Sequence, residues 1–164
     1  DVATWRFAVQ QAERKIIVLL AEYHDAAEAL TFCLKAGVSG VDLQRQLRLV
    51  VTPLLLHRLC EKCAVPCKMP KRFVEEFIRL GLPTNRLRGK AGCLECDHSG
   101  VKTLPAVVYH VEIPTEEWFL APSEKRLHEV VGSLPFLRIV ALCLAAKGLV
   151  SLEEIEQKLY EKEI

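Results

Sequence analysis

The sequence lacks both a long hydrophobic run and an excess of charge of one sign. Its 164 residues carry 22 Lys and Arg against 21 Asp and Glu, a formal net charge of +1. No overall attraction to nucleic acid or to an anionic membrane follows from that balance. The longest apolar stretch, 134–146, contains Arg138 and is shorter than the roughly 20 residues that span a bilayer. With no apolar signal core at its start, the chain is expected in the cytoplasm, without membrane insertion.

Aromatic residues and methionine are also scarce. Aromatics make up 7% of the chain and there is one Met, although hydrophobic residues in total reach 51%. This composition excludes wholesale disorder and predicts a core of aliphatic side chains and alanine. Because the chain starts without Met and opens directly into a helical pattern, we expect it to be a piece of a longer protein.

The apolar periodicity switches between helix and strand signals, which predicts a helix-rich α/β fold. In the first half, the run at 16–20 is the strand signal, because three of its five residues are β-branched. The elements expected there are a helix over 5–14, a buried strand over 16–20, a helix capped by Asp25 and Glu28 that ends at Gly37, and a helix that starts at Ser39 or Asp42 and carries Leu43, Leu47 and Val50.

The second half predicts further helices around one strand. A Ser at 151 with a Glu at 154 is the spacing of a capping box, which marks a helix start. The expected elements are a helix over 70–80 with Phe73 and Phe77 inward, a strand over 104–113, helices over 123–131 and 135–147, and a final helix with Leu152, Ile155 and Leu159 inward.

Cysteine is the one unusual component, with seven residues, four of which form two C-x-x-C pairs. The pairs are Cys60 with Cys63 and Cys93 with Cys96. Each C-x-x-C turn lets two thiolates converge on one ion, and two turns supply the closed four-sulfur shell of structural zinc. A closed shell leaves no position for a substrate water, so this zinc is expected to support folding rather than catalysis.

Other interpretations of the cysteines stay open at this stage. The pairs could be redox motifs, two disulfides or iron–sulfur ligands. Cys67, His57 and His98 lie close enough in sequence to compete as ligands, although we interpret them as flanking residues. Cys33 and Cys143 fall on apolar helical faces and are expected to be core thiols.

No self-sufficient active site is visible. The phosphate-binding pattern G-x-x-x-x-G-K-[ST] is absent, because Thr84 and Ala91 occupy two of its positions. The polar cluster at 22–25 follows the predicted strand, where α/β sheets bind ligands, so it is either a catalytic or nucleotide-sensing edge or simply a helix cap. A basic loop could bind nucleic acid, but it has no interleaved aromatic platform and we favour a solvated face; its residues are Lys68, Lys71, Arg72, Arg86, Arg88 and Lys90.

The order of these features resembles one family, the GspE/PilB-type secretion ATPases, which are RecA-like motors of type II secretion and type IV pilus assembly. The resemblance is one of arrangement and covers essentially the whole chain. The tetracysteine signature is its most specific element. The matching stretches are 92–100 for Gly-Cys-x-x-Cys-x-x-x-Gly, 54–63 for the stretch that ends in Leu-Cys-x-x-Cys, 34–38 for Leu-x-x-Gly-Val, and 148–155 for the closing Gly-x-x-Thr-x-Glu-Glu.

The resemblance implies a fold class and a division of the chain. The fold would be the C-terminal part of a RecA-like ATPase domain with a zinc subdomain and terminal helices. Residues 1–58 would end the RecA-like core, 59–103 would form the zinc-binding subdomain, and 104–164 would form a C-terminal strand and helical subdomain. The family's role implies a cytoplasmic hexamer, peripheral to the inner membrane, that acts on an inner-membrane platform protein.

The chain also departs from the family. It lacks the family's phosphate loop and Walker B motif, and Ala3 stands where the family has an acidic residue. The family's His box is replaced by Glu22, Tyr23 and His24. No catalytic residue is therefore assigned, and ATP with Mg would act only in a full-length protein. A different class stays open: a non-enzymatic, zinc-stapled interaction module that serves as a degenerate motor subunit or adaptor.

Overall fold

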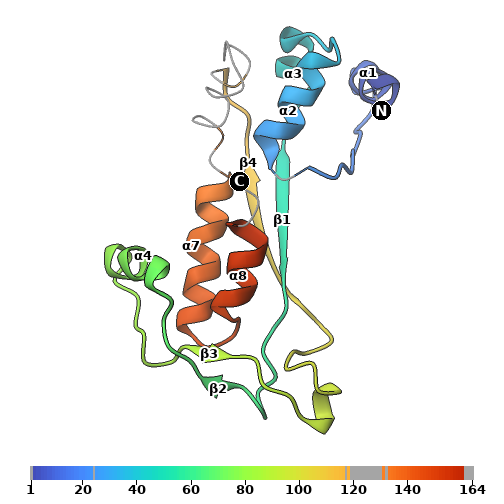
Figure 1. Cartoon of the computed structure of the whole chain (residues 1–164). Helices are drawn as coiled ribbons and strands as arrows, with labels where there is room; N and C mark the ends of the chain where they lie inside the picture. The colour runs from blue at the N-terminus through green and yellow to red at the C-terminus, as the bar shows by residue number, and fades with distance from the viewer. Residues whose placement is uncertain (1, 24, 117, 119–130, 132, 161–164) are drawn as a thin grey trace. The chain divides into compact units, whose positions relative to one another are not determined.

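The computed structural model describes residues 2–23, 25–116, 118, 131 and 133–160 (Figure 1). The chain divides into two compact units. Unit 1 comprises Asp1–Thr52 and His110–Leu134, and unit 2 comprises Pro53–Tyr109 and Pro135–Ile164. Helices and short strands are mixed along the sequence, as the periodicity predicts. No helix in the described part of the chain is both long enough and apolar enough to cross a membrane.

Unit 1 contains three helices: α1 (Val2–Gln11), α2 (Ala26–Lys35) and α3 (Gly40–Gln46). The predicted cap of α2 is confirmed, because the Asp25 side chain accepts a hydrogen bond of 2.8 Å from the backbone N–H of Glu28. Two apolar clusters hold these helices together. The first contains Ala26, Ala27, Leu30, Trp118 and Val131, and the second contains Cys33, Val38 and Leu43 with Trp5, Val9 and Leu34 against them.

The buried strand predicted over 16–20 is wrong. This segment has no strand partner among the described residues, and Ile16 and Leu20 are 97% and 91% exposed. Its β-branched composition suits a strand, but a strand also needs a neighbour that supplies hydrogen bonds and covers its side chains. The described sheets consist of β1 with β4 and β2 with β3, and they do not include this segment.

The ligand-binding edge expected at 22–25 required a strand over 16–20. Because that strand is not formed among the described residues, the edge is not formed either. Tyr23 lies against Phe32, with ring centroids 5.5 Å apart, and against Trp5, at 6.4 Å. Asp25 is the N-cap of α2. His24 lies outside the described residues. The helix-cap interpretation of this cluster is thus the one that the described residues support.

The helix expected to reach Val50 ends earlier than predicted. Helix α3 stops at Gln46, and Val50 begins strand β1 (Val50–Leu56), which contains Pro53. Strand β1 pairs with β4 (Ala106–Glu112), the strand predicted over 104–113. Proline is tolerated there because each strand of a two-stranded sheet has one edge without ladder hydrogen bonds.

Unit 2 contains three of the helices predicted for the second half, those over 70–80 and 135–147 and the final one. Phe73 and Phe77 are fully buried, as expected for the inward face of the helix over 70–80. Ser151 caps the last helix by accepting a 3.2 Å hydrogen bond from the backbone N–H of Glu154. The helix predicted over 123–131 lies outside the described residues except at Val131. The elements are β2 (Val65–Pro66), η1 (Lys71–Phe73), α4 (Val74–Arg79), β3 (Arg88–Gly89), η2 (Leu94–Cys96), α7 (Ser133–Ala146) and α8 (Leu152–Leu159).

Tyr160, directly after α8, ties the helices of unit 2 together. Its hydroxyl donates to the carboxylate of Glu76 on α4 at 2.8 Å, and its ring meets Phe73 edge-on. Burial and that carboxylate raise the pKa of Tyr160. Arg138 of α7 lies 4.7 Å above the ring and donates to the carbonyl of Leu159. Helices α7 and α8 accordingly lie side by side (Figure 1).

Substitution of Leu20 tests the correction to the predicted strand. Because Leu20 is exposed, Leu20→Ala should change the free energy of unfolding by less than about 0.5 kcal/mol. The matched control, Leu30→Ala, removes a buried side chain of α2 and should cost about 2–5 kcal/mol. Urea denaturation followed by circular dichroism gives both values. An equal cost for the two variants would restore the buried strand and contradict the structure.

Candidate metal centre

A short antiparallel pairing joins the two ends of segment 59–101, which contains the four paired cysteines. Leu59 and Val101 form a β-bridge. Around it, the backbone N–H of Cys60 donates to the carbonyl of Gly100 at 2.9 Å, and that of Lys102 donates to the carbonyl of Arg58 at 2.7 Å. Since one C-x-x-C pair begins at this bridge and the other ends just before it, the pairing brings the two pairs together.

A second antiparallel ladder lies within segment 59–101. Strands β2 and β3 pair antiparallel, with Val65 opposite Gly89 and Pro66 opposite Arg88. The ladder is extended by the backbone N–H of Cys67, which donates to the carbonyl of Leu87 at 3.2 Å. The two ladders together fix the chain that enters and leaves each cysteine pair.

The sulfur atoms of Cys60, Cys63, Cys93 and Cys96 all lie within 4.8 Å of one another. Three of the separations are 3.9 Å for Cys60 to Cys93, 3.7 Å for Cys63 to Cys96 and 3.7 Å for Cys93 to Cys96. Sulfurs placed tetrahedrally about 2.3 Å from a zinc ion would be about 3.8 Å apart. The four thiols therefore have the spacing of a four-sulfur metal shell, and they could hold one ion.

The turn after the second pair directs one backbone N–H at a sulfur. Gly100 donates its N–H to the sulfur of Cys96 at 3.3 Å, and the N–H of His98 bonds the carbonyl of Cys93 at 2.9 Å. Gly100 has φ +73°, and a Cβ there would lie 2.1 Å from the carbonyl oxygen of Ala91. Only glycine fits this position, so it is required for the close approach of the backbone at 100 to the backbone at 91.

The metal-free thiols perturb each other in opposite directions. Hydrogen bonding with the backbone at Cys93 and Gly100 lowers the pKa of Cys96 to about 6. Desolvation and the neighbouring thiols raise the pKa of Cys63 to about 12. One thiolate is thus stabilised while further ionisation is opposed, because negative sulfurs this close repel each other. A bound divalent cation would remove that conflict and let all four sulfurs bind as thiolates.

Ion pairs join the turns around the sulfurs. Lys62, inside the first pair, contacts Glu95, inside the second. Glu61 accepts a 2.6 Å hydrogen bond from Lys102, which holds the pKa of that carboxyl below its usual range. Periodicity and cysteine spacing do not predict these pairs, although Lys62 between one pair of cysteines and Glu95 between the other are a signal that could have indicated the first.

The residues considered as competing ligands lie outside this group of four. His57 binds Glu154 through Nδ1 at 2.6 Å, and His98 is exposed. The thiol of Cys67 is partly buried, which raises its pKa. Cys33 is a core thiol as predicted, with its pKa raised to about 12 by burial, whereas Cys143 is only partly buried.

Three of the six residues of the basic loop make contacts within unit 2. Arg72 pairs with Glu156, Arg88 donates to the carbonyl of Ala64 at 3.0 Å, and Lys90 donates to Glu154 at 3.1 Å. Charges that are already paired offer less to a phosphate backbone. These contacts support the interpretation of the loop as a solvated, internally paired surface.

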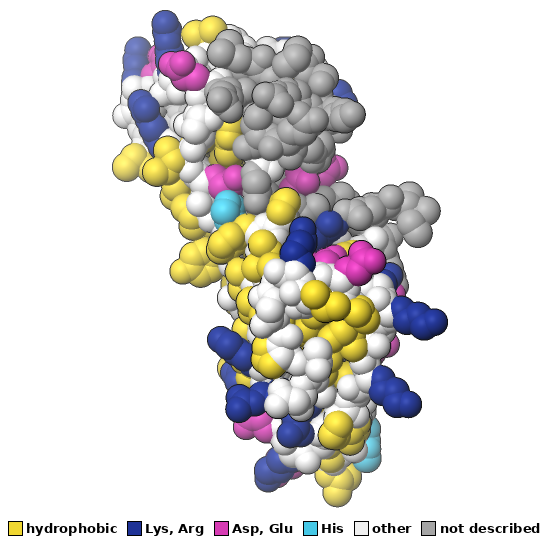
Figure 2. Space-filling view, turned by 90° about the vertical axis from the view of Figure 1, so that its left-hand side faces the viewer, with side chains coloured by type: hydrophobic (Ala, Val, Ile, Leu, Met, Phe, Trp, Pro, Cys, Tyr) yellow, Lys and Arg dark blue, Asp and Glu magenta, His cyan; other side chains and the backbone are white. Residues whose placement is uncertain are grey.

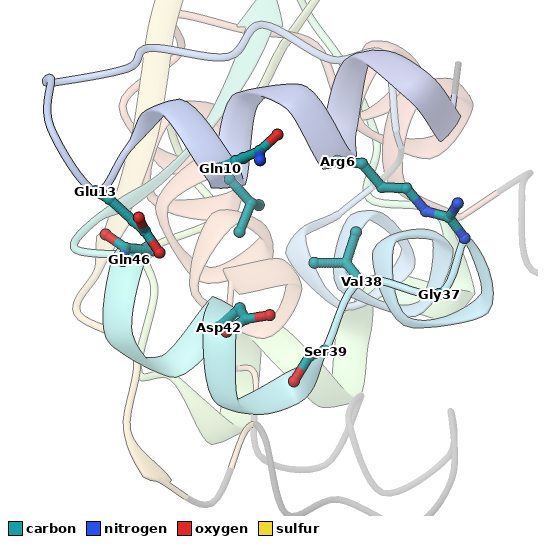
Figure 3. A pocket seen from close by; sticks show the side chains of 9 residues that line it. Arg6, Gln10, Glu13, Gly37, Val38, Ser39, Asp42 and Gln46 are labelled. Atoms are coloured by element: carbon teal, nitrogen blue, oxygen red, sulfur yellow. The ribbon is translucent and has the colours of Figure 1, made fainter.

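Unit 1 has a shallow polar pocket of about 350 Å³ between α1 and α3 (Figure 3). Arg6 lies at one end of it, where its Nε donates to the carbonyl of Ala36 at 3.0 Å. Glu13 and Asp42 line it as well, so the pocket carries charges of both signs. It contains no cysteine or histidine, and we assign it no catalytic role.

One curated protein gives a weak match, and no family model matches the chain. The chain is 26% identical to the type IV pilus assembly ATPase PilB of Acinetobacter baylyi over 167 aligned positions. The match covers 96% of this chain but 29% of that protein. The chain is therefore similar over nearly its whole length to part of a pilus assembly ATPase.

Substitution of single cysteines tests the assignment of the four sulfurs. The purified chain should contain one metal ion, and Cys63→Ser or Cys93→Ser should lose it and unfold residues 60–100. The loss is large because four-sulfur metal binding, about 10–16 kcal/mol for zinc, matches the stability of a whole domain. Elemental analysis and thermal melts give the result. Cys143→Ser is the matched control and should keep the metal; a metal-free parent would refute the site.

Acid should release the metal. Protons and the metal compete for the same four sulfurs, so each thiolate that must be protonated weakens apparent binding as the pH falls. Release measured with a chromogenic chelator should therefore increase as the pH is lowered from 8 to 5, and it should reverse on neutralisation. A metal content that does not change over this range would indicate that the ion is held elsewhere, by groups other than thiolates.

Proposed function

We propose that this chain is the C-terminal portion of a GspE/PilB-like traffic ATPase for type II secretion or type IV pilus assembly. The observation that carries the proposal is the coincidence of two features. Four cysteines whose sulfurs lie within 4.8 Å of one another occur in a chain that is similar over 96% of its length to part of a pilus assembly ATPase. In this proposal residues 1–58 end a RecA-like core, 59–103 form the zinc subdomain, and 104–164 form the strand and terminal helices.

The ion in the proposed subdomain is zinc, held by Cys60, Cys63, Cys93 and Cys96. Four thiolates in tetrahedral spacing are the donor set that zinc prefers in structural sites. Four protein ligands fill its coordination shell, so it has no open position for a substrate water. Its role is to keep segment 59–103 rigid, so that this part of the motor can transmit force or dock against a partner.

The remaining functions are taken from the proposed family. The full-length protein would form a cytoplasmic hexamer, peripheral to the inner membrane, and would act on an inner-membrane platform protein. ATP and Mg would bind through a phosphate loop that this chain lacks. None of the four cysteines would touch the nucleotide. The chain by itself would therefore not hydrolyse ATP.

The exposed apolar side chains support a place in a larger assembly. The described surface carries many of them, as the yellow areas of Figure 2 indicate. The segment 16–20 exposes Ile16, Val18 and Leu20, at 97%, 81% and 91%. Strand β4 likewise exposes Val107 and Tyr109, at 58% and 62%.

The proposal requires the gene to encode a longer protein, and ATPase measurements on that protein test it. We expect a phosphate loop in the residues encoded upstream, hexamers by light scattering, and ATP turnover that the isolated 164-residue chain lacks. Cys63→Ser in the longer protein should leave nucleotide binding intact but impair assembly of the pilus or secretion of its substrate. A longer protein with no phosphate loop and no turnover would refute the motor and favour the non-enzymatic interaction module.

A further inference from the structure

Glu154 is a buried carboxylate whose position the capping-box pattern does not explain. It lies in the first turn of α8, and its side chain is only 4% exposed. Its backbone N–H donates the expected capping hydrogen bond to the Ser151 hydroxyl oxygen. Its carboxylate, however, binds residues from two distant segments of unit 2. A buried charge is costly unless it is paired, so these partners stabilise the carboxylate in its buried position.

Each carboxylate oxygen of Glu154 contacts a different segment of the chain. Oε1 accepts from the backbone N–H of His57 at 3.3 Å and lies 2.6 Å from its Nδ1. Oε2 accepts from Nζ of Lys90 at 3.1 Å. Burial by itself would raise the pKa of Glu154, but the hydrogen bonds from His57 and Lys90 outweigh it and hold that pKa below its usual range. The group is therefore an anion that bridges two cationic or polar partners.

His57 and Lys90 occupy equivalent positions relative to the two C-x-x-C pairs. His57 precedes Cys60 by three residues, and Lys90 precedes Cys93 by three residues. Glu154 thus contacts the incoming chain of both C-x-x-C pairs. The loop before α8 adds a third bond to the first of these segments, because the backbone N–H of Leu59 donates to the carbonyl of Leu149 at 2.9 Å.

We propose that Glu154 is a positioning residue for the metal centre. Its carboxylate fixes the spacing of segments 57–60 and 90–93, which lead into the two C-x-x-C pairs, so that the four sulfurs of the pairs meet one ion. The inference rests on the metal site proposed above. A metal that binds a preordered set of ligands does not have to supply the free energy for ordering them. Without the bridge, that ordering free energy is subtracted from metal affinity. Outer residues that orient metal ligands typically contribute about 10–100-fold to affinity.

Metal titration of the whole chain with Co²⁺ under reducing conditions tests this inference. Glu154→Gln keeps the size of the side chain and removes its charge, and we expect it to weaken Co²⁺ binding about tenfold, the lower end of the range for outer residues. Its spectrum at saturation should remain that of four-thiolate Co²⁺. Glu153→Gln is the matched control, because Glu153 lies on the same turn of α8 but is exposed, and it should bind as the parent does.

Two further variants keep the inference testable if Glu154→Gln does not fold. Lys90→Met removes the contact to Oε2, and His57→Gln removes the imidazole contact to Oε1 but keeps the backbone N–H bond. The two side chains are 29% and 50% exposed, and each variant should weaken binding by a few-fold. A purely structural role would lower the melting temperature of the metal-free and metal-loaded forms equally and leave the affinity unchanged.

The outcomes separate the inference from the metal site itself. Weaker binding by the bridge variants with an unchanged saturated spectrum supports the inference. Equal affinity of Glu154→Gln, Lys90→Met, His57→Gln and the parent overturns it while leaving the metal site in place. A parent chain that binds no Co²⁺ at all overturns the metal site, whatever the variants do.

Discussion

Four ionisable thiols within 4.8 Å of one another constrain everything around them in unit 2. Such a group is unfavourable without a cation, because each thiolate that forms opposes the next. Three features of the surrounding chain hold the group together: two short antiparallel ladders, the close approach of two backbone segments that Gly100 allows, and the ion pair of Lys62 with Glu95. These features have a common effect, which is to bring two turns distant in sequence to one point.

Local signals in the sequence predicted the elements that are determined locally. The cap at Asp25 needs only the N–H groups of the next turn, and the inward pair Phe73 and Phe77 needs only helical periodicity. The C-x-x-C turns belong to the same class, because the spacing of each pair is set within four residues. Sequence reasoning could therefore name the four sulfurs that the structure brings together.

Sheet formation could not be predicted in the same way. The run at 16–20 has a strand composition but no described partner, whereas Val50–Leu56 contains a proline and yet pairs with β4. Whether a segment becomes a strand depends on a neighbour elsewhere in the chain, which composition does not reveal. Glu154 is a similar case, since its spacing from Ser151 identifies a cap, but its carboxylate binds His57 and Lys90 far away in sequence.

The contacts of Glu154 and Leu149 bear on how a motor could use a zinc subdomain. A rigid metal centre transmits displacement only if it is fixed to the elements that move. In unit 2 that connection runs from the segment before Cys60 to the loop that precedes α8 and to its first turn. Tyr160 continues it from the end of α8 to α4. In the proposed motor, displacement of α8 would therefore reach the metal centre through the hydrogen bonds of its first turn, and displacement of α4 would reach α8 through the hydrogen bond of Tyr160.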